Sequence, residues 1–223
     1  MSQRKVLELF YDVVSPYSWL GFEILCRYKN IWNVDVQLRP GFLGGIMNTT
    51  GNSPPAMVPK KGIYMTKDLE RLAEFYQVPL RQPSDFFHVV IKKGSLSAMR
   101  FVTAVQMSHP EYLEEVCREL WVRIWSEDKD ITEPESILQA AKKAGIPEDL
   151  AKKLLSSISS PEVKTKLKET TDKALGYGIF GMPSIVAHIN DKPELYFGSD
   201  RFELLAHRLG EQWLGPMPQK SKL

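Results

Sequence analysis

Residues 6 to 18 read Val-Leu-Glu-Leu-Phe-Tyr-Asp-Val-Val-Ser-Pro-Tyr-Ser, and this stretch decides the fold class. Its first part, residues 6 to 14, is largely apolar and rich in β-branched and aromatic side chains, which is typical of a buried strand. Ser15 and Pro16 follow at once. Serine is favoured at the N-cap of a helix and proline at its first position. The stretch therefore predicts a strand that passes directly into a helix.

The residues that follow complete a strand–helix–strand unit. Apolar side chains recur every three or four positions from Leu20 to Ile31, as on one face of an amphipathic helix. Residues 34 to 38 then predict a second strand. Residues 41 to 62 are rich in glycine, proline and asparagine, and we expect a long loop there. A loop of this length in a compact domain is more often functional than idle.

The rest of the chain, from residue 63, predicts a long run of helices followed by two strands and a last helix. Residues 63 to 160 show helical spacing throughout, and another helix is expected from Pro161. Two short strand patterns, 184 to 189 and 194 to 198, follow a glycine-rich turn. A last helix is expected after Ser199-Asp200, which would cap it.

With the long helical block removed, the order of elements is that of thioredoxin. We therefore predict an α/β fold in which residues 1–62 and 161–223 form a thioredoxin-like domain and residues 63–160 form an all-helical insertion. The G-x-G-x-x-G stretch at 176 to 181 leaves a helix and opens a strand, whereas a dinucleotide fingerprint does the reverse. We interpret its glycines as a helix stop and turn.

Composition excludes several classes of protein. The chain has 223 residues, a formal net charge of +2 and no basic stripe, so nucleic acid is not an expected partner. No apolar run approaches the roughly 20 residues of a membrane span, and the start lacks a secretory signal pattern. The two cysteines, Cys26 and Cys117, lie far apart, which indicates a reducing compartment. The four histidines show no metal-ligand spacing, so no metal site is expected.

The turn at Ser15 is where chemistry is expected. Redox proteins of thioredoxin fold carry Cys-x-x-Cys where the first strand meets the first helix. Here that position reads Ser15-Pro16-Tyr17-Ser18, and disulfide exchange requires sulfur. The helix N-terminus still offers unpaired N–H groups and partial positive charge, which stabilise an anion such as a thiolate. A hydrogen bond from the Ser15 hydroxyl would add to this, although spacing alone equally allows Ser15 to be only an N-cap.

A second candidate element lies just before the third strand. Gly181-Met182-Pro183-Ser184 faces the first motif in a thioredoxin fold, and a proline here is often cis. A cis Met182-Pro183 bond would leave the Met182 backbone free to pair with an extended, peptide-like ligand. The alternative is an ordinary trans proline before an edge strand.

At this point the sequence resembles the kappa-class glutathione transferases over nearly its whole length. The motifs that carry the resemblance are Leu-Phe-Tyr-Asp-Val-Val-Ser-Pro-Tyr-Ser-Trp-Leu-Gly (9 to 21), Gly-Asn-Ser-Pro-Pro (51 to 55), Lys61-Gly62, Gly-Ser-Leu-Ser-Ala-Met-Arg-Phe (94 to 101), Arg-Glu-Leu-Trp (118 to 121), Asp-Ile-Thr-Glu-Pro (130 to 134), Phe-Gly-Met-Pro (180 to 183) and Phe-Gly-Ser-Asp-Arg (197 to 201). Several independent motifs in the right order make a chance match very improbable.

The resemblance implies a homodimer that uses glutathione as a co-substrate and holds no bound cofactor. It implies that Ser15 is the catalytic serine. The other residues that it places at glutathione are Pro16 and Tyr17 beside the thiol, Asn52 and Lys61 in a binding loop, Met182 and Pro183 at the cysteinyl part, and Ser199 and Asp200 at the γ-glutamyl end. Met182 departs from the leucine expected in many members, which a backbone contact tolerates. Whether Asp200 acts within its own subunit or across the dimer stays open.

The expected activity is conjugation of the glutathione thiolate to small electrophiles. Peroxide reduction by the same thiolate, and the identity of the physiological electrophile, stay open. One alternative is a glutathione-dependent isomerase of the 2-hydroxychromene-2-carboxylate type. Another is a non-catalytic thioredoxin-fold adaptor or chaperone, which the charged loop at 51 to 62 disfavours. Ser221-Lys222-Leu223 predicts recognition by the peroxisomal import receptor, and the resemblance also allows a mitochondrial location.

Overall fold

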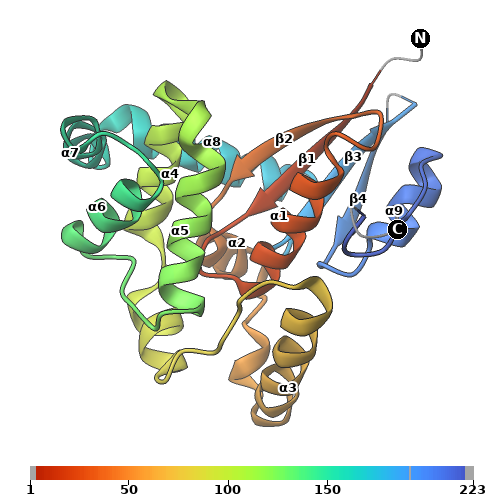
Figure 1. Cartoon of the computed structure of the whole chain (residues 1–223), viewed down its shortest axis with the longest axis horizontal. Helices are drawn as coiled ribbons and strands as arrows, with labels where there is room; N and C mark the ends of the chain where they lie inside the picture. Colours follow the sequence, from red (N-terminus) through yellow and green to blue (C-terminus); the bar gives the residue numbers. More distant parts are fainter. Residues whose placement is uncertain (1–3, 191, 219–223) are drawn as a thin grey trace.

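A mixed β-sheet forms the centre of the computed structural model, which describes residues 4–190 and 192–218. Within that part of the chain the sheet has the strand order β2-β1-β3-β4 (Figure 1). Strand β1 (Lys5–Tyr11) runs parallel to β2 (Val34–Pro40) and antiparallel to β3 (Ser184–Ile189). Strand β4 (Lys192–Phe197) pairs antiparallel to β3 and forms one edge of the sheet. This is the predicted thioredoxin-like arrangement, with β1 in its interior.

Alternate side chains of β1 point to opposite faces of the sheet, and helices cover both. Tyr11 makes an edge contact with Phe22 of helix α1 (Pro16–Tyr28), with ring centroids 5.6 Å apart. Phe10 makes the corresponding contact on the other face with Tyr177, directly after helix α8 (Pro161–Gly176). Both β1 side chains are fully buried. Burial on both faces explains why residues 6 to 14 read as a nearly continuous apolar run.

The block between the two halves is helical, as predicted. It contains α4 (Leu96–Ser108), α5 (Leu113–Trp125), α6 (Pro134–Lys143) and α7 (Glu148–Ser157), with a π-helix, η2 (Phe87–Lys93), before them and a 3₁₀ turn, η3 (Pro110–Tyr112), between α4 and α5. Helices α4 to α7 gather at one end of the molecule (Figure 1).

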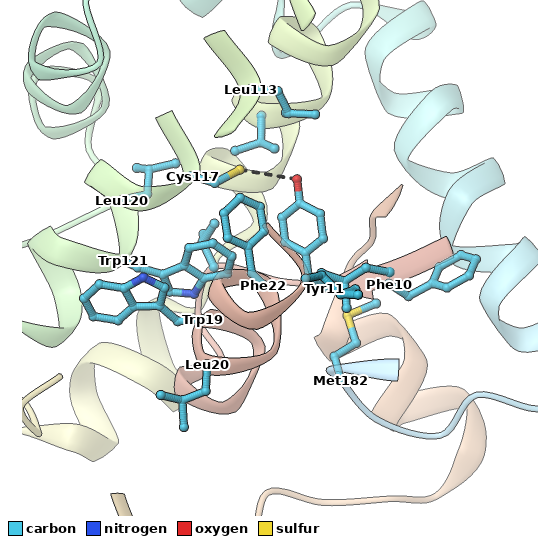
Figure 2. Packing of buried hydrophobic residues seen from close by; sticks show 14 of the residues in the cluster. Phe10, Tyr11, Trp19, Leu20, Phe22, Leu113, Cys117, Leu120, Trp121 and Met182 are labelled. Carbon is cyan, nitrogen blue, oxygen red and sulfur yellow. Dashed lines mark hydrogen bonds between the residues drawn. The ribbon is translucent and has the colours of Figure 1, made fainter. Parts of the chain in front are cut away.

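The block and the sheet share one aromatic core. Trp121 of α5 is fully buried, stacks on Trp19 with an interplanar angle of 3°, and contacts Phe22 at a centroid distance of 4.9 Å. Figure 2 shows these rings packed together beside Tyr11, whose hydroxyl lies 3.3 Å from the Cys117 sulfur. Burying aromatic side chains of this size contributes a few kcal/mol each. The insertion is therefore fixed firmly against the strand–helix unit.

Residues 41 to 62 are not the long loop expected from their composition. They contain helix α2 (Leu43–Thr50), a 3₁₀ turn, η1 (Pro55–Met57), and the start of helix α3 (Pro59–Tyr76). A Cβ atom on Gly44 would lie 2.9 Å from the Phe42 ring, so this helix tolerates a poor helix former because the ring packs against its backbone. Pro59 stands at the first helical position, the same signal that identified α1.

Two further expectations need correction. The predicted domain boundary at 62/63 falls inside α3, a helix that packs on α1 and η1. Ser199-Asp200 does not cap the last helix, α9 (Phe202–Leu209), because the N-cap position is Arg201 and no side chain caps it. Asp200 and Ser199 thus lie one and two residues before the N-cap position. No helix in the described residues has both the length and the apolar character needed to cross a membrane.

Candidate functional site

Ser15 occupies the turn between β1 and α1 and makes bonds that fit both interpretations of its role. As the N-cap of α1, its Oγ accepts a hydrogen bond from Ser18 N at 3.1 Å. The same hydroxyl donates to the carbonyl oxygen of Met182 at 3.2 Å. Only 6% of Ser15 is exposed. The capping bond uses a lone pair, so the hydroxyl proton is directed toward the Met182–Pro183 segment.

That segment lies opposite the start of α1, as the sequence predicted. The Met182–Pro183 peptide bond is cis. A Cβ atom on Gly21 of α1 would come within 3.2 Å of the Pro183 ring, so glycine permits this close approach of helix and loop. Among the described residues, none accepts a hydrogen bond from the Met182 backbone N–H. The donor is therefore available to an extended ligand beside Ser15.

A residue of the helical insertion also forms a hydrogen bond to the turn at Ser15. The indole Nε1 of Trp121 donates to the carbonyl oxygen of Ser15 at 3.1 Å, and both groups are buried. The sequence did not predict this contact. The one signal in the sequence was the Arg-Glu-Leu-Trp motif at 118 to 121. The sequence does not show, however, that the helix with this motif faces the Ser15 turn.

Tyr17 is fixed by a residue that sequence analysis did not single out. Its hydroxyl donates to Asp68 of α3 at 3.0 Å, and the Tyr64 hydroxyl lies 3.4 Å from the other oxygen of the same carboxylate. Burial and the neighbouring Asp68 raise the pKa of Tyr17, so this phenol stays protonated. Pro16, at the first position of α1, is buried. Tyr64 and Asp68 stand four residues apart on a helix, a spacing that places them on one face.

Asn52 is hydrogen-bonded next to the Met182–Pro183 segment, whereas Lys61 makes no hydrogen bond to any described residue. The Asn52 side-chain amide donates to the carbonyl oxygen of Phe180 at 2.8 Å. Lys61 is exposed in the first turn of α3 and makes no hydrogen bond or ion pair with another described residue. The structure thus brings Asn52 to the site and leaves the Lys61 ammonium free at the start of a neighbouring helix.

Ser199 and Asp200 adjoin Pro183 through the end of β4. Gly198 N donates to the Pro183 carbonyl at 3.0 Å, and its φ of 109° suits glycine. Ser199 is buried and its carbonyl accepts a hydrogen bond from Tyr76 Oη at 2.9 Å. Asp200 is exposed and pairs with Arg201 at 3.4 Å. Burial raises the pKa of Tyr76, and the nearby carboxylates of Asp200 and Asp68 raise it further.

These contacts define one site around the start of α1. It combines a helix N-terminus, the buried Ser15 hydroxyl, the Met182 backbone donor and the side chains of Tyr17 and Asn52. The protein's own thiols take no part, because burial raises the pKa of Cys117 to about 12 and also raises that of Cys26. No cluster of three or more metal-ligating side chains occurs within residues 4–190 and 192–218.

Comparison with known proteins agrees with this geometry. Residues 6–210 match the model of the DSBA-like thioredoxin domain family. The chain is 58% identical over 214 residues to glutathione S-transferase kappa 1 of Homo sapiens, covering 96% of this chain and 95% of the relative. It is 25% identical over 210 residues to 2-hydroxychromene-2-carboxylate isomerase of Sphingobium xenophagum, covering 90% and 96%.

A solved structure of a 2-hydroxychromene-2-carboxylate isomerase superposes with a TM-score of 0.73 at 22% identity, covering 92% of this chain and 94% of the other. That similarity concerns the fold, whereas the 58% identity extends through nearly the entire chain. The chain therefore belongs to the kappa class of glutathione S-transferases, within the DSBA-like thioredoxin domain family.

Proposed function

We propose that this protein binds glutathione, lowers the pKa of its thiol and transfers the resulting thiolate to a small electrophile. The observation that carries the proposal is the Ser15 hydroxyl, which lies at the N-terminus of α1 and 3.2 Å from the Met182 carbonyl, where redox relatives carry sulfur. A serine cannot exchange disulfides, yet it can stabilise a thiolate supplied by a ligand. The human relative that shares 58% of its residues is named a glutathione S-transferase.

The site would activate the thiol by stabilising its charge. A free thiol has a pKa near 8.5, so only a few per cent is thiolate at pH 7. The partial positive charge at the start of α1 and a hydrogen bond from Ser15 both favour the thiolate. On binding, the Ser15 proton would turn from the Met182 carbonyl to the sulfur. The thiol proton leaves to solvent, the sulfur forms a bond to the electrophilic carbon, and the leaving group departs with its electron pair.

The remaining site residues would hold the ends of glutathione. The Met182 N–H is free to pair with the cysteinyl backbone, next to Asn52. Lys61 supplies a positive charge for a carboxylate, and Asp200 a negative charge for the γ-glutamyl ammonium. Gly198 N donates to the Pro183 carbonyl, and this bond keeps the neighbouring Ser199 and Asp200 near the Met182–Pro183 segment. No bound redox cofactor or metal is needed for this reaction.

The test is a direct assay of conjugation. Glutathione and a chloronitroaromatic electrophile should react faster with the protein than in buffer, and omission of glutathione should abolish the reaction. Calorimetry should show glutathione binding without the electrophile. A protein that neither binds glutathione nor accelerates the reaction would contradict the proposal and favour a non-catalytic adaptor. Glutathione-dependent reduction of an organic hydroperoxide in the same preparation would extend the activity to peroxides.

The isomerase relatives make a second activity worth testing. Their fold is similar, and one curated relative is 25% identical over 210 residues. Turnover of 2-hydroxychromene-2-carboxylate at a rate well above that of conjugation would move this chain to the isomerase type. We propose conjugation because the chain is far more similar to the transferase relatives.

We also propose a homodimer whose interface lies along edge strand β4. Phe180 and Phe197 are 41% and 42% exposed and contact each other at a centroid distance of 4.5 Å. Leu195, on the same strand, is 36% exposed. Exposed aromatic side chains on an unpaired sheet edge favour association with another surface. A second copy there would lie close to Asn52 and to the Gly198–Asp200 segment.

We propose a peroxisomal location for this enzyme, with mitochondria as the alternative. The signal is Ser221-Lys222-Leu223, which lies outside the described residues. Cells that express the chain with an N-terminal fluorescent tag should show labelled peroxisomes. Removal of the last three residues should make the label diffuse. Diffuse or mitochondrial label from the intact chain would contradict the peroxisomal assignment.

A further inference from the structure

Asp12 is a buried carboxylate three residues before Ser15 that the proposed reaction does not use directly. It is fully buried, and both of its carboxylate oxygens accept hydrogen bonds. One oxygen accepts from Val14 N at 2.9 Å. The other accepts from Leu43 N at 2.9 Å and from the Ser95 hydroxyl at 2.9 Å. All three partners are hydrogen-bond donors, so the group is satisfied as an ionised acceptor.

The three donors come from three different parts of the molecule. Val14 belongs to the β1–α1 turn itself. Leu43 is the first residue of α2, the helix that leads to Asn52, and Ser95 holds the N-cap position of α4 in the helical insertion. The Asp12 backbone carbonyl also accepts a hydrogen bond from Ser15 N at 3.0 Å. One residue therefore joins the turn of Ser15 to helix α2 and to the helical insertion.

We infer that Asp12 is a positioning residue that fixes the Ser15 hydroxyl and the start of α1 relative to the bound glutathione thiol. This inference rests on the proposed function. Its physical basis is that the Asp12 carboxylate ties the turn from 12 to 15 to both α2 and α4, in addition to the bonds that Ser15 makes with Trp121 and Met182. If the turn relaxes, the Ser15 hydroxyl and the α1 N–H groups point less accurately at the sulfur. Hydrogen bonds weaken steeply with misalignment, so the thiolate loses stabilisation.

The chemistry of the cluster predicts that an amide cannot replace the carboxylate. In Asp12→Asn, one of the two oxygens becomes an NH₂ group. Whichever orientation the amide takes, that NH₂ faces a backbone N–H, either Val14 N or Leu43 N, because each oxygen accepts from one of them. A donor facing a donor leaves a buried group unsatisfied. Burial raises the pKa of Asp12 to about 6 against the opposing effect of its three hydrogen bonds, so measurements above pH 7 observe the carboxylate.

Strand β1 offers a matched control in Glu8. It is also a buried carboxylate, 2% exposed, but its partners are Arg39, Lys173, Tyr177 and His188, none of which belongs to the site. Glu8→Gln removes the same charge from the strand that leads into the turn, and none of the Glu8 partners belongs to the Ser15 turn. Ser95→Ala removes one of the three donors to Asp12 without changing the carboxylate.

The experiment measures the pKa of the bound thiol from thiolate absorbance, together with kcat and KM, in the full-length protein. Asp12→Asn should raise the thiol pKa by about one unit and lower kcat by up to tenfold at a fixed pH just above 7, where wild-type Asp12 is ionised. KM for glutathione should change much less, because the carboxylate touches no part of the ligand. Ser95→Ala should shift the thiol pKa in the same direction by a smaller amount. Glu8→Gln should leave the thiol pKa at its wild-type value.

Several outcomes would overturn the inference. An Asp12→Asn protein that folds and has the wild-type thiol pKa would show that Asp12 only supports the fold. An equal rise of the thiol pKa in Glu8→Gln would show a general effect of disturbing a buried carboxylate near β1, and not a role of Asp12 in the turn. If Asp12→Asn does not fold, an unchanged thiol pKa in Ser95→Ala decides against the inference. Failure of the wild type itself to bind glutathione would instead contradict the proposed function.

Discussion

At the scale of single residues, Ser15 makes two hydrogen bonds at once. Its Oγ caps α1 by accepting from Ser18 N and also donates to Met182 O. A hydroxyl can do both, because the acceptor lone pairs and the donor proton are separate. The helix cap thus positions the proton that we expect to reach the thiolate. The Ser18 hydroxyl, in contrast, is buried and has no partner among the described residues.

Replacement of Ser15 should separate capping from thiol activation. Ser15→Ala should bind glutathione but raise the pKa of its thiol, because the hydrogen bond to the thiolate is lost while the helix terminus remains. It should also lose about 1 kcal/mol of stability with the N-cap. Ser18→Ala, the control, removes an unpartnered hydroxyl and should change neither thiol pKa nor conjugation rate. Thiolate absorbance against pH measures the effect. If the thiol pKa and the conjugation rate of Ser15→Ala equal those of the wild type, Ser15 acts only as the N-cap of α1.

The charged groups at the ends of the site should contribute affinity without supporting the fold. Lys61 and Asp200 are both exposed. Lys61→Ala and Asp200→Ala should each weaken glutathione binding by about 1–3 kcal/mol, the range for hydrogen bonds to charged groups. Lys60→Ala provides a control in the same turn of α3, with the same charge removed. Calorimetric titration gives the affinities. Wild-type affinity in both variants would remove these residues from the site.

At the scale of elements, Glu8 ties three strands to one helix on the face of the sheet away from α1. Its carboxylate accepts from Arg39 of β2 and Lys173 of α8 and lies 2.9 Å from His188 Nε2 of β3. Burial alone would raise the pKa of Glu8, but the bonds from Lys173, His188 and Arg39 outweigh it and lower the value to about 2. The ionised form therefore stabilises the folded state.

This shift predicts a loss of stability in acid. The folded pKa lies below the unfolded value of 4.5, so the stabilisation is complete above that value and is lost as pH falls toward 2. By linkage, Glu8 should contribute on the order of 2 to 3 kcal/mol at pH 7. Glu8→Gln should be less stable at neutral pH and should lose less on acidification. Denaturant unfolding at several pH values measures both effects.

Glu119 of α5 is a useful comparison, because its pKa is shifted in the opposite direction from that of Glu8. Burial raises its pKa, although Lys143 works against the shift. Protonation of Glu119 on acidification therefore removes the free-energy cost of its buried charge, and Glu119→Gln should not reduce stability at neutral pH.

For the Glu8 prediction, the contradicting outcome is a free energy of unfolding that depends on pH in the same way in the wild type and in Glu8→Gln. That result would mean that the Glu8 network does not contribute to folding stability.

At the scale of the whole molecule, the edge of the sheet should determine the oligomeric state. If the exposed residues of β4 form the dimer interface, Leu195→Glu should introduce charge repulsion across it and yield monomers. Met107→Glu, a control on α4 where the native residue is 47% exposed, should leave the dimer intact. Sedimentation velocity measures the mass directly. A Leu195→Glu protein that stays dimeric, or a monomeric wild type, would place the interface elsewhere or exclude it.

Local sequence patterns were sufficient to predict all four strands, most of the helices and the turn at Ser15. Strand, N-cap serine and proline stand next to one another in residues 6 to 18, so local propensity was sufficient to predict β1, α1 and the Ser15 turn. The thioredoxin order and the helical insertion followed from periodicity. Family resemblance supplied Asn52, Lys61, Met182, Ser199 and Asp200, whose roles are still predictions.

Only the tertiary structure decided which distant residues hold that turn. Asp12 meets Leu43 and Ser95, and Tyr17 meets Asp68, across separations of many residues that no local pattern encodes. Helix α2 was missed for the same reason. Its two glycines predict a loop, and it forms because the Phe42 ring packs on that bare backbone while the Asp12 carboxylate accepts from its first N–H. Packing and burial of polar groups act between elements, and so they appear only when the chain has folded.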